Sequence, residues 1–347
     1  MARLSFPKLT SEGDKLLVIQ PLVGIGDMVW HKKWIDQLIC HHHVILATKQ
    51  SSQPAILFED SLSADQILYI ERNARGQKGK HDGLMGLFRL AAAFRRTGAK
   101  TALLLHHSNR YRHALALAGI KIVYGFGFGK QSRLAGHELA PSDKMIHATD
   151  RMAKFWHNNG WPDPESGWQI AISDDRKAEF KDRFAAAYDK PDQLLVLGIG
   201  AMHPDRCWPA ERFADLILHL QSQRPDLVPV IMGGPAERHI ADDIQNQLAQ
   251  KQAPAVLEAF GSLRDAVTLL SLAKGYVGND TSLLNIAAVL DTPSLGLFSQ
   301  SPPLTYVDHL HHLDVIASQD YGKAGIIKTI TVDDVIRGIG QIWPTDK

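Results

Sequence analysis

Residues 278–288 read GNDTSLLNIAA, and they follow the apolar run Gly275-Tyr276-Val277. This order predicts a strand that leads directly into a helix, because an apolar run is followed by polar residues able to cap a helix and then by an apolar segment. The first backbone N–H groups of such a helix lack partners within it and lie at the positive end of its dipole, so they can hold a phosphate. A buried strand followed by a capped helix with a purely structural role has the same pattern. The stretch alone leaves both interpretations open.

Strand-like and helical patterns alternate along the whole chain, which predicts the α/β class with parallel sheets covered by helices on both faces. The predicted strands are residues 15–19, 44–47, 66–70, 100–105, 120–125, 194–200, 228–233, 256–259, 275–277 and 294–298. Residues 161–167 contain two prolines and a glycine, which break helix and strand. We therefore predict two domains, 1–165 and 166–330. Residues 331–347 are predicted to form a last helix, whose apolar residues have helical spacing.

Composition indicates an ordinary globular protein, with 45% hydrophobic and 22% charged residues. Two cysteines far apart in the sequence exclude a disulfide framework and give no zinc-site spacing. The first eight residues contain no apolar run typical of a signal peptide, and no later stretch approaches the ~20 apolar residues of a spanning helix. These features predict a cytoplasmic protein.

Charge is divided between the two halves of the chain. Residues 1–172 contain 22 Lys and Arg against 14 Asp and Glu, whereas residues 173–347 contain 16 against 23. A basic half attracts anionic partners, and nucleic acid, an anionic membrane surface or a phosphorylated glycolipid would all satisfy it. A merely solvated face is the alternative. No nucleic-acid motif accompanies the charge, so we do not expect nucleic acid as a partner.

Five segments of the second half occur in a characteristic order. They are the strand at 194–200, a basic residue before Trp208-Pro209, the run Gly233-Gly234-Pro235-Ala236-Glu237, the pair Asp280-Thr281, and the strand that begins at Thr292-Pro293. This order and spacing resemble glycosyltransferase family nine, which includes the lipopolysaccharide heptosyltransferases. Near the amino end, residues 16–19 followed by Gly24-Ile25-Gly26-Asp27 look like that family's first strand and Gly-Asp turn. The resemblance covers most of the chain and is weakest between residues 50 and 165.

The resemblance implies the GT-B architecture, in which two Rossmann-like domains face each other across a cleft, with the last helix crossing back to the N-terminal domain. It implies an inverting, metal-independent enzyme without a cofactor, which transfers heptose from ADP-heptose to the lipopolysaccharide inner core or a related anionic glycan. The N-terminal domain would bind the acceptor, and the C-terminal domain the donor. Another nucleotide sugar, or a degenerate sugar-nucleotide-binding or scaffold protein, are the alternatives. Peripheral contact with the cytoplasmic face of the inner membrane is left open.

Asp27 is the expected catalytic base, because it matches the aspartate of the Gly-Asp turn and follows the first strand. Sugar transfer needs a group that takes the proton from the attacking hydroxyl. Gly26 would let the acceptor approach the backbone closely. A structural role for Asp27 as the cap of the following helix is the alternative.

Donor binding is expected from residues of three segments. Arg206 precedes Trp208-Pro209 and matches the family's Lys or Arg that meets the donor phosphates, which a guanidinium can bind through two hydrogen bonds. Asp280, Thr281 and Ser282 would offer cap side chains and backbone N–H groups to the same diphosphate. Glu237 matches the glutamate that binds the nucleotide ribose.

This chain departs from its relatives at two positions after Asp280-Thr281. Many relatives have Gly where this chain has Ser282, and His where it has Asn285. Ser282 narrows the expected phosphate pocket, and Asn285 supplies no titrating side chain.

The acceptor is expected to meet the basic segment 71–83. It contains three glycines and no apolar periodicity, and it follows a predicted strand end. We expect four of its cations to contact an anionic acceptor: Arg72, Arg75, Lys78 and Lys80. No metal site is expected, since no Asp-x-Asp motif occurs in the sequence.

Overall fold

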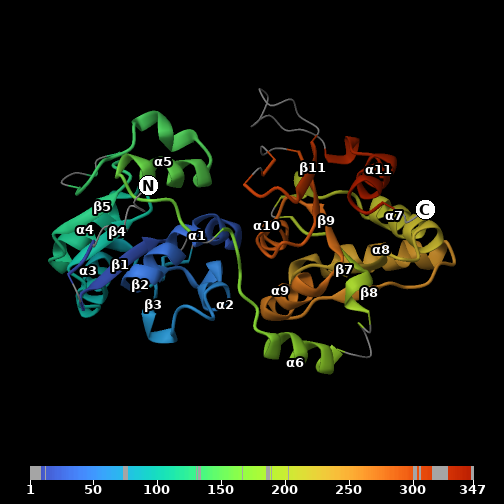
Figure 1. The fold of residues 1–347 in the computed structure, drawn as a ribbon, viewed down its shortest axis with the longest axis horizontal. Helices are drawn as coiled ribbons and strands as arrows, with labels where there is room; N and C mark the ends of the chain where they lie inside the picture. The colour runs from blue at the N-terminus through green and yellow to red at the C-terminus, as the bar shows by residue number, and fades with distance from the viewer. Residues whose placement is uncertain are drawn as a thin grey trace. The chain divides into compact units, whose positions relative to one another are not determined.

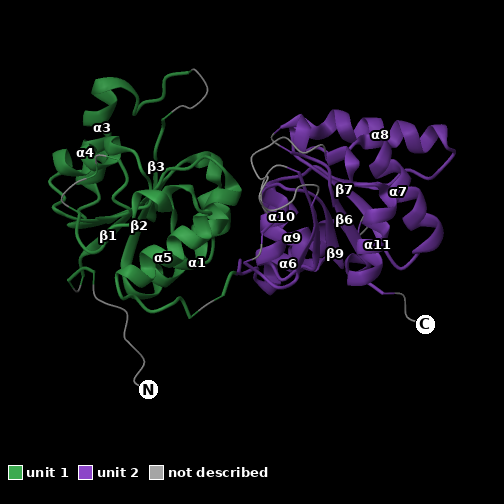
Figure 2. Cartoon of the chain, turned by 90° about the horizontal axis from the view of Figure 1, so that it is seen from above, with its two compact units in different colours: residues 1–168 green, residues 169–347 purple. Residues whose placement is uncertain are grey.

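The computed structural model divides into two compact units, residues 1–168 and 169–347 (Figure 2). It describes residues 9–11, 13–72, 77–129, 131, 134–165, 167–184, 188, 190–201, 203–299, 303–304, 306–314 and 327–344. The boundary lies slightly beyond the predicted one, after Trp168 rather than after residue 165. Trp168 explains the shift, because its ring packs edge-on against Trp34 of the first unit, with the ring centroids 5.1 Å apart.

The first unit is a parallel sheet with helices on both faces. Its strands are β1 (Lys15–Gln20), β2 (His43–Thr48), β3 (Ile67–Tyr69), β4 (Thr101–Leu104) and β5 (Ile122–Gly125), in the order β3-β2-β1-β4-β5. Its helices are α1 (Ile25–His41), α2 (Pro54–Leu57), α3 (Gly83–Arg96), α4 (Asn109–Ala118) and α5 (Ala148–Asn158). The strands are continuous apolar runs because both faces are covered. Helices α3 and α4 lie side by side on one face, and α1 contacts α5 on the other (Figure 2).

The second unit repeats this plan with one more strand. Its strands are β6 (Leu194–Gly198), β7 (Val228–Met232), β8 (Leu257–Ala259), β9 (Gly275–Asn279), β10 (Ser294–Phe298) and β11 (Leu310–Asp314), in the order β11-β10-β9-β6-β7-β8. Its helices are α6 (Asp174–Phe184), α7 (Ala210–Gln223), α8 (Arg238–Gln250), α9 (Leu263–Leu272), α10 (Ser282–Val289) and α11 (Val332–Ile342). All strand pairings are parallel. Strand β11 was not predicted, because its sequence LHHLD lacks the apolar run of a central strand.

Helix α11 packs on the second unit, alongside α7 (Figure 1). Val335 and Ile339 join the apolar core of that unit. Trp343 lies over Gly275, where an added Cβ would come within 2.0 Å of the indole ring, and its Nε1 donates to the Lys274 carbonyl at 3.3 Å. The expectation that residues 331–347 also pack onto the N-terminal domain stays a prediction. The apolar face of α11 is used within its own unit.

Each sheet reverses its strand order at one place, between β1 and β4 in the first unit and between β6 and β9 in the second. In open parallel sheets, ligands bind outside the carboxyl ends of the strands at such a switch point. Gly198 and Gly278 pair at the second switch point, where a Cβ on Gly278 would lie 2.4 Å from the Gly198 carbonyl oxygen. No helix in the described part of the chain has the length and apolar character needed to cross a membrane.

Candidate functional site

Asp27 lies in the first turn of α1, which follows β1 after the short connection of residues 21–24. Its Oδ2 accepts a hydrogen bond from the backbone N–H of Gly24 at 3.1 Å. Gly24 has no room for a side chain, because a Cβ there would lie 2.7 Å from that oxygen. Asp27 is therefore the third residue of α1 and bonds back to the cap residue Gly24, rather than capping the helix itself.

The environment of Asp27 favours its protonated form. Burial raises the pKa of its carboxyl above the usual range, and the hydrogen bond from Gly24 opposes the shift only in part. A raised pKa brings a carboxylate closer to the value that suits a general base near neutral pH. Gly26 lies beside it in the same turn and is partly exposed.

A buried polar network fixes the backbone beneath Asp27. Nδ1 of His31 lies 2.6 Å from the Asp27 carbonyl oxygen, and Nε2 of Gln20 donates to the same oxygen at 3.4 Å. Thr48 donates in turn to Oε1 of Gln20 at 3.3 Å. Burial lowers the pKa of His31 to about 4, so the ring is neutral at pH 7 and its Nδ1 carries the hydrogen that the carbonyl accepts. No pattern in the sequence indicated this network.

Basic residues follow the carboxyl ends of three strands around the first switch point. Lys49 follows β2, Arg72 follows β3 and His106 follows β4. Burial lowers the pKa of His106 to about 3, and nearby charges on Arg72, Lys49 and Arg151 lower it further. Burial also lowers the pKa of Lys49, with Arg72 adding to the shift. Of this group, only Arg72 was predicted from the sequence, although the strand-end rule applied to β4 would have indicated His106.

The predicted acceptor segment divides in the structure. Arg72 points toward this cationic group, where its Nε donates to Asp82 at 3.3 Å and its Nη1 to the Tyr111 hydroxyl at 3.4 Å. Lys80 instead lies 3.4 Å from Glu71, and both side chains are more than half exposed. Lys78 is exposed, and Arg75 lies outside the described residues. The structure thus connects Arg72 with the strand ends and does not bring Lys80 to the same group.

Arg206 and Asp280 meet at the second switch point. Arg206 ends the short turn Pro204–Arg206 after β6, and its Nη1 lies 3.6 Å from the carboxylate of Asp280, directly after β9. Asn279 joins the two segments, since its Oδ1 accepts from the Trp208 N–H at 3.0 Å and its Nδ2 donates to the Ile199 carbonyl at 2.8 Å. Two predicted donor-site residues thus contact one another.

Glu237 lies over the ends of β6 and β7. Its Oε2 accepts from the Gly234 N–H at 2.7 Å, and the side chain covers Gly200 and Gly233, where added Cβ atoms would lie 2.9 and 3.2 Å from it. Glycine at both positions allows this approach. The second oxygen of Glu237, Oε1, lies 3.3 Å from the position of a Cβ on Gly200.

The start of α10 combines Thr281, Ser282 and Asn285. Thr281 is the cap residue and Ser282 the first helical residue. Asn285 is buried, donates to the Thr281 carbonyl at 2.9 Å, and accepts from the Tyr306 hydroxyl at 2.9 Å. Burial and the charge of Asp280 raise the pKa of Tyr306, which therefore stays a neutral donor. Asn285, one of the two departures from the family pattern, thus has a structural role in holding the helix start.

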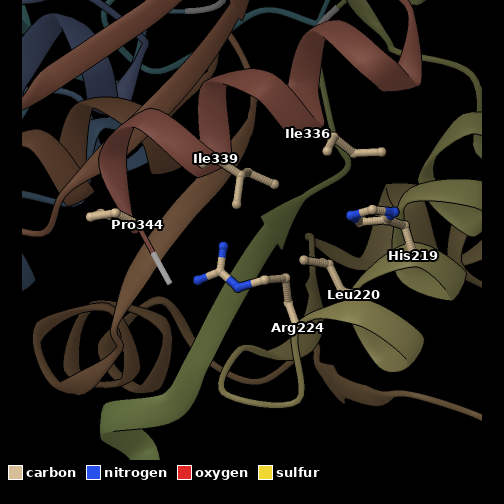
Figure 3. A pocket seen from close by; sticks show the side chains of 7 residues that line it. His219, Leu220, Arg224, Ile336, Ile339 and Pro344 are labelled. Atoms are coloured by element: carbon tan, nitrogen blue, oxygen red, sulfur yellow. The ribbon is translucent and has the colours of Figure 1, made fainter. Parts of the chain in front are cut away.

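A separate hollow of about 350 Å³ lies between α7 and α11 (Figure 3). His219, Leu220 and Arg224 line one side, and Ile336 and Ile339 the other. The Arg224 guanidinium already binds both carboxylate oxygens of Asp226, at 2.9 and 2.8 Å. None of the predicted site residues lines this hollow. Among the described residues, no group of three or more His, Cys, Asp or Glu side chains has an arrangement that could hold a metal ion.

These features define a protein of two Rossmann-type units, each with polar residues at its switch point. The chain belongs to glycosyltransferase family 9 (heptosyltransferase), whose family model matches residues 87–327. The match starts after Asp27 and includes Arg206, Glu237 and the start of α10.

The chain is 23% identical over 220 residues to the lipopolysaccharide core heptosyltransferase OpsX of Haemophilus influenzae, an alignment that covers 62% of this chain and 61% of that relative. It thus spans about three fifths of OpsX. A family 9 glycosyltransferase of Veillonella parvula DSM 2008 has a similar fold, with a TM-score of 0.76 at 18% identity, covering 95% of this chain and 97% of the other. The ADP-heptose lipopolysaccharide heptosyltransferase II of E. coli also has a similar fold, with a TM-score of 0.74 at 19% identity. That match covers 94% of this chain and 98% of the other. These similarities confirm the predicted family and the GT-B fold class.

Proposed function

We propose that this protein is an inverting, metal-independent glycosyltransferase that transfers heptose from ADP-heptose to the lipopolysaccharide inner core or a related anionic glycan. Family membership and the relatives named as heptosyltransferases support the transfer. The observation that carries the proposal is the placement of Asp27 at one switch point and of Arg206 with the start of α10 at the other. We assign acceptor binding to residues 1–168 and donor binding to residues 169–347. We also propose that the protein acts in the cytoplasm.

The reaction needs three contributions from the protein. Asp27 takes the proton of the acceptor hydroxyl. At the same time, the oxygen of that hydroxyl forms a bond to the anomeric carbon of the donor sugar. The bond from that carbon to the diphosphate oxygen breaks at the same time, and ADP leaves with the electron pair. Arg206 and the free N–H groups at the start of α10 stabilise the charge that develops on the departing diphosphate. Asp280 orients the Arg206 guanidinium, and Glu237 accepts hydrogen bonds from the ribose hydroxyls.

Transfer by the purified protein tests this proposal. The protein is incubated with a lipopolysaccharide core acceptor and either ADP-heptose or another nucleotide sugar. The mass of the glycan product is then measured by mass spectrometry. A product heavier by one heptose, formed only from ADP-heptose, supports the proposal. A product formed from another nucleotide sugar would assign a different donor. Binding of ADP without any transfer would identify a degenerate sugar-nucleotide-binding protein, for which Ser282 and Asn285 are the motivating residues.

Transfer is expected to continue in an excess of EDTA, with added Mg²⁺ changing the rate by less than about twofold. The physical reason is that a guanidinium and a helix N-terminus neutralise diphosphate charge without a cation. The measurement is the initial rate with and without chelator. Loss of activity in EDTA that Mg²⁺ restores would contradict this assignment.

Replacement of Arg72, Arg75, Lys78 and Lys80 by Ser is expected to raise the acceptor KM by roughly 10-fold, since each exposed charge contributes modestly. The dependence of KM on salt should flatten as well, because screened attractions are removed. ADP affinity should not change. Because Arg72 also bonds to Asp82 and Tyr111, a variant with only Lys78 and Lys80 replaced separates acceptor binding from folding.

The matched control for this loop variant is Lys100→Ser. Lys100 is an exposed cation of the same unit that pairs with Asp14 at 3.0 Å, just before β4 and so at the opposite end of the strands. Acceptor KM and salt dependence equal to wild type in the loop variant would show that the loop is only a solvated connection.

A further inference from the structure

The outer face of α3 exposes three large apolar side chains. Leu84 is 72% exposed, Met85 65% and Phe88 50%. Leu84 and Phe88 are one turn apart on the same side of the helix, and Met85 is adjacent. The opposite side of α3 is used in the core, where Leu90 and Phe94 are fully buried. A cluster of exposed apolar side chains on a folded domain marks a surface that another body covers.

The same face continues into cations along the helix. Arg89, Arg95 and Arg96 are exposed, and α3 contains no Asp or Glu. Arg95 donates to the carbonyl groups of Leu117 and Ala118. Arg89 and Arg96 form no hydrogen bond or ion pair with any residue that the structure describes. The face therefore presents an apolar end and a cationic end whose charges are not neutralised locally.

A hollow of about 340 Å³ opens beside this cationic end. Its lining contains three basic side chains and no acidic one; the residues are Leu68, Tyr69, Lys80, His81, Arg89, Ala92, Ala93 and Arg96. Burial lowers the pKa of His81, and Lys80 is paired with Glu71 at 3.4 Å, so the permanent positive charge of the hollow comes from Arg89 and Arg96. Such a hollow accepts an anionic group whose neighbouring atoms are apolar.

We propose that the outer face of α3 is a docking surface for an anionic lipid bilayer. Leu84, Met85 and Phe88 enter the boundary between headgroups and acyl chains, while Arg89 and Arg96 contact lipid phosphates, one of which occupies the hollow. Amphipathic surfaces with large apolar and basic residues bind membranes in this way. A second copy of the chain is a poorer occupant, since symmetric pairing of this face would bring arginines together. The proposal is independent of the proposed transfer, because lipid binding needs neither donor nor acceptor.

Sedimentation of the full chain with lipid vesicles tests the docking surface. The protein is expected to sediment with phosphatidylglycerol vesicles at low salt, and much less with phosphatidylcholine vesicles. Replacing Leu84, Met85 and Phe88 together by Ser should lower the partition coefficient about 10-fold or more, since three apolar side chains leave the membrane. The double variant Arg89→Ser/Arg96→Ser should lower it roughly 30-fold at about 1 kcal/mol per cation, and should reduce its salt dependence.

The matched control is Leu117→Ser/Lys121→Ser. It removes one exposed apolar residue and one exposed cation of the same unit that lie outside α3. All variants change exposed side chains, and thermal unfolding checks that each is folded. The control should bind vesicles as wild type does.

Three results would overturn the proposal. The first is equal vesicle binding by wild type and both α3 variants. The second is the absence of wild-type binding to phosphatidylglycerol. The third is a wild-type dimer, seen by analytical ultracentrifugation, that the triple variant at Leu84, Met85 and Phe88 converts to a monomer, which would make a second copy the occupant. Transfer activity in solution is measured in parallel, so failure of docking and failure of the proposed transfer are distinguishable.

Discussion

Asp27→Asn is expected to reduce sugar transfer to a small residual rate while ADP binding stays within a few-fold of wild type. The amide cannot take a proton, and loss of a general base lowers the rate by about 100- to 10,000-fold. Because the base acts in the transition state and not in nucleotide recognition, the loss should appear in kcat. The measurements are initial rates at saturating substrate and ADP titration by calorimetry. Turnover near the wild-type rate would remove Asp27 from the mechanism.

Asp36→Asn is the matched control for this variant. Asp36 lies on the same helix, burial likewise raises the pKa of its carboxyl, and it is paired with Lys32 at 2.8 Å. Its replacement should lower stability through the broken pair and leave kcat close to wild type. Asn at position 27 retains an oxygen that can accept from the Gly24 N–H, so helix α1 should persist in Asp27→Asn.

The pH dependence of transfer follows from the same carboxyl. Only the deprotonated form of Asp27 acts as a base, and burial raises its pKa. The rate should therefore fall as pH is lowered through this raised pKa, at a higher pH than an exposed aspartate would give. The residual rate of Asp27→Asn should lack that decline.

Arg206→Ala weakens ADP binding by about 10- to 150-fold, the equivalent of roughly 1.5–3 kcal/mol for a hydrogen bond to a charged group. The variant also removes the guanidinium charge that faces the Asp280 carboxylate, so that less of this negative charge is offset near the diphosphate. ADP titration measures the effect directly. An unchanged dissociation constant would place the diphosphate elsewhere.

Arg238→Ala provides the control for the donor side. Arg238 is a partly exposed cation of the same unit, paired with Glu258 and stacked over Phe260. Its loss removes an equal charge from the unit without changing the segments after β6 and β9. ADP affinity equal to wild type in Arg238→Ala, together with the loss in Arg206→Ala, would locate the diphosphate at the second switch point.

Two structural features could be predicted from the sequence because they depend on local patterns. Apolar runs such as residues 194–200 form strands in either half, and the polar residues after β9 start a helix, as the order of residue types dictates. Arg206 and Asp280 were predicted to belong to the same donor site, but their direct contact was not predicted. Strand β11 was missed because an edge strand with two histidines is stabilised by its pairing with β10 rather than by its own residues.

Sequence by itself thus determined the two α/β units, most of their strands and the polar residues that follow strand ends, since these depend on periodicity and local caps. Only the tertiary structure decided which of those residues meet. The strand order, set by pairing between distant segments, brings Arg206 to Asp280 and gathers Lys49, Arg72 and His106. Trp343 packs against Gly275, which precedes it by 68 positions in the sequence, and this contact decided where α11 lies. Such contacts arise from burial between segments far apart in the chain, and no local pattern encodes them.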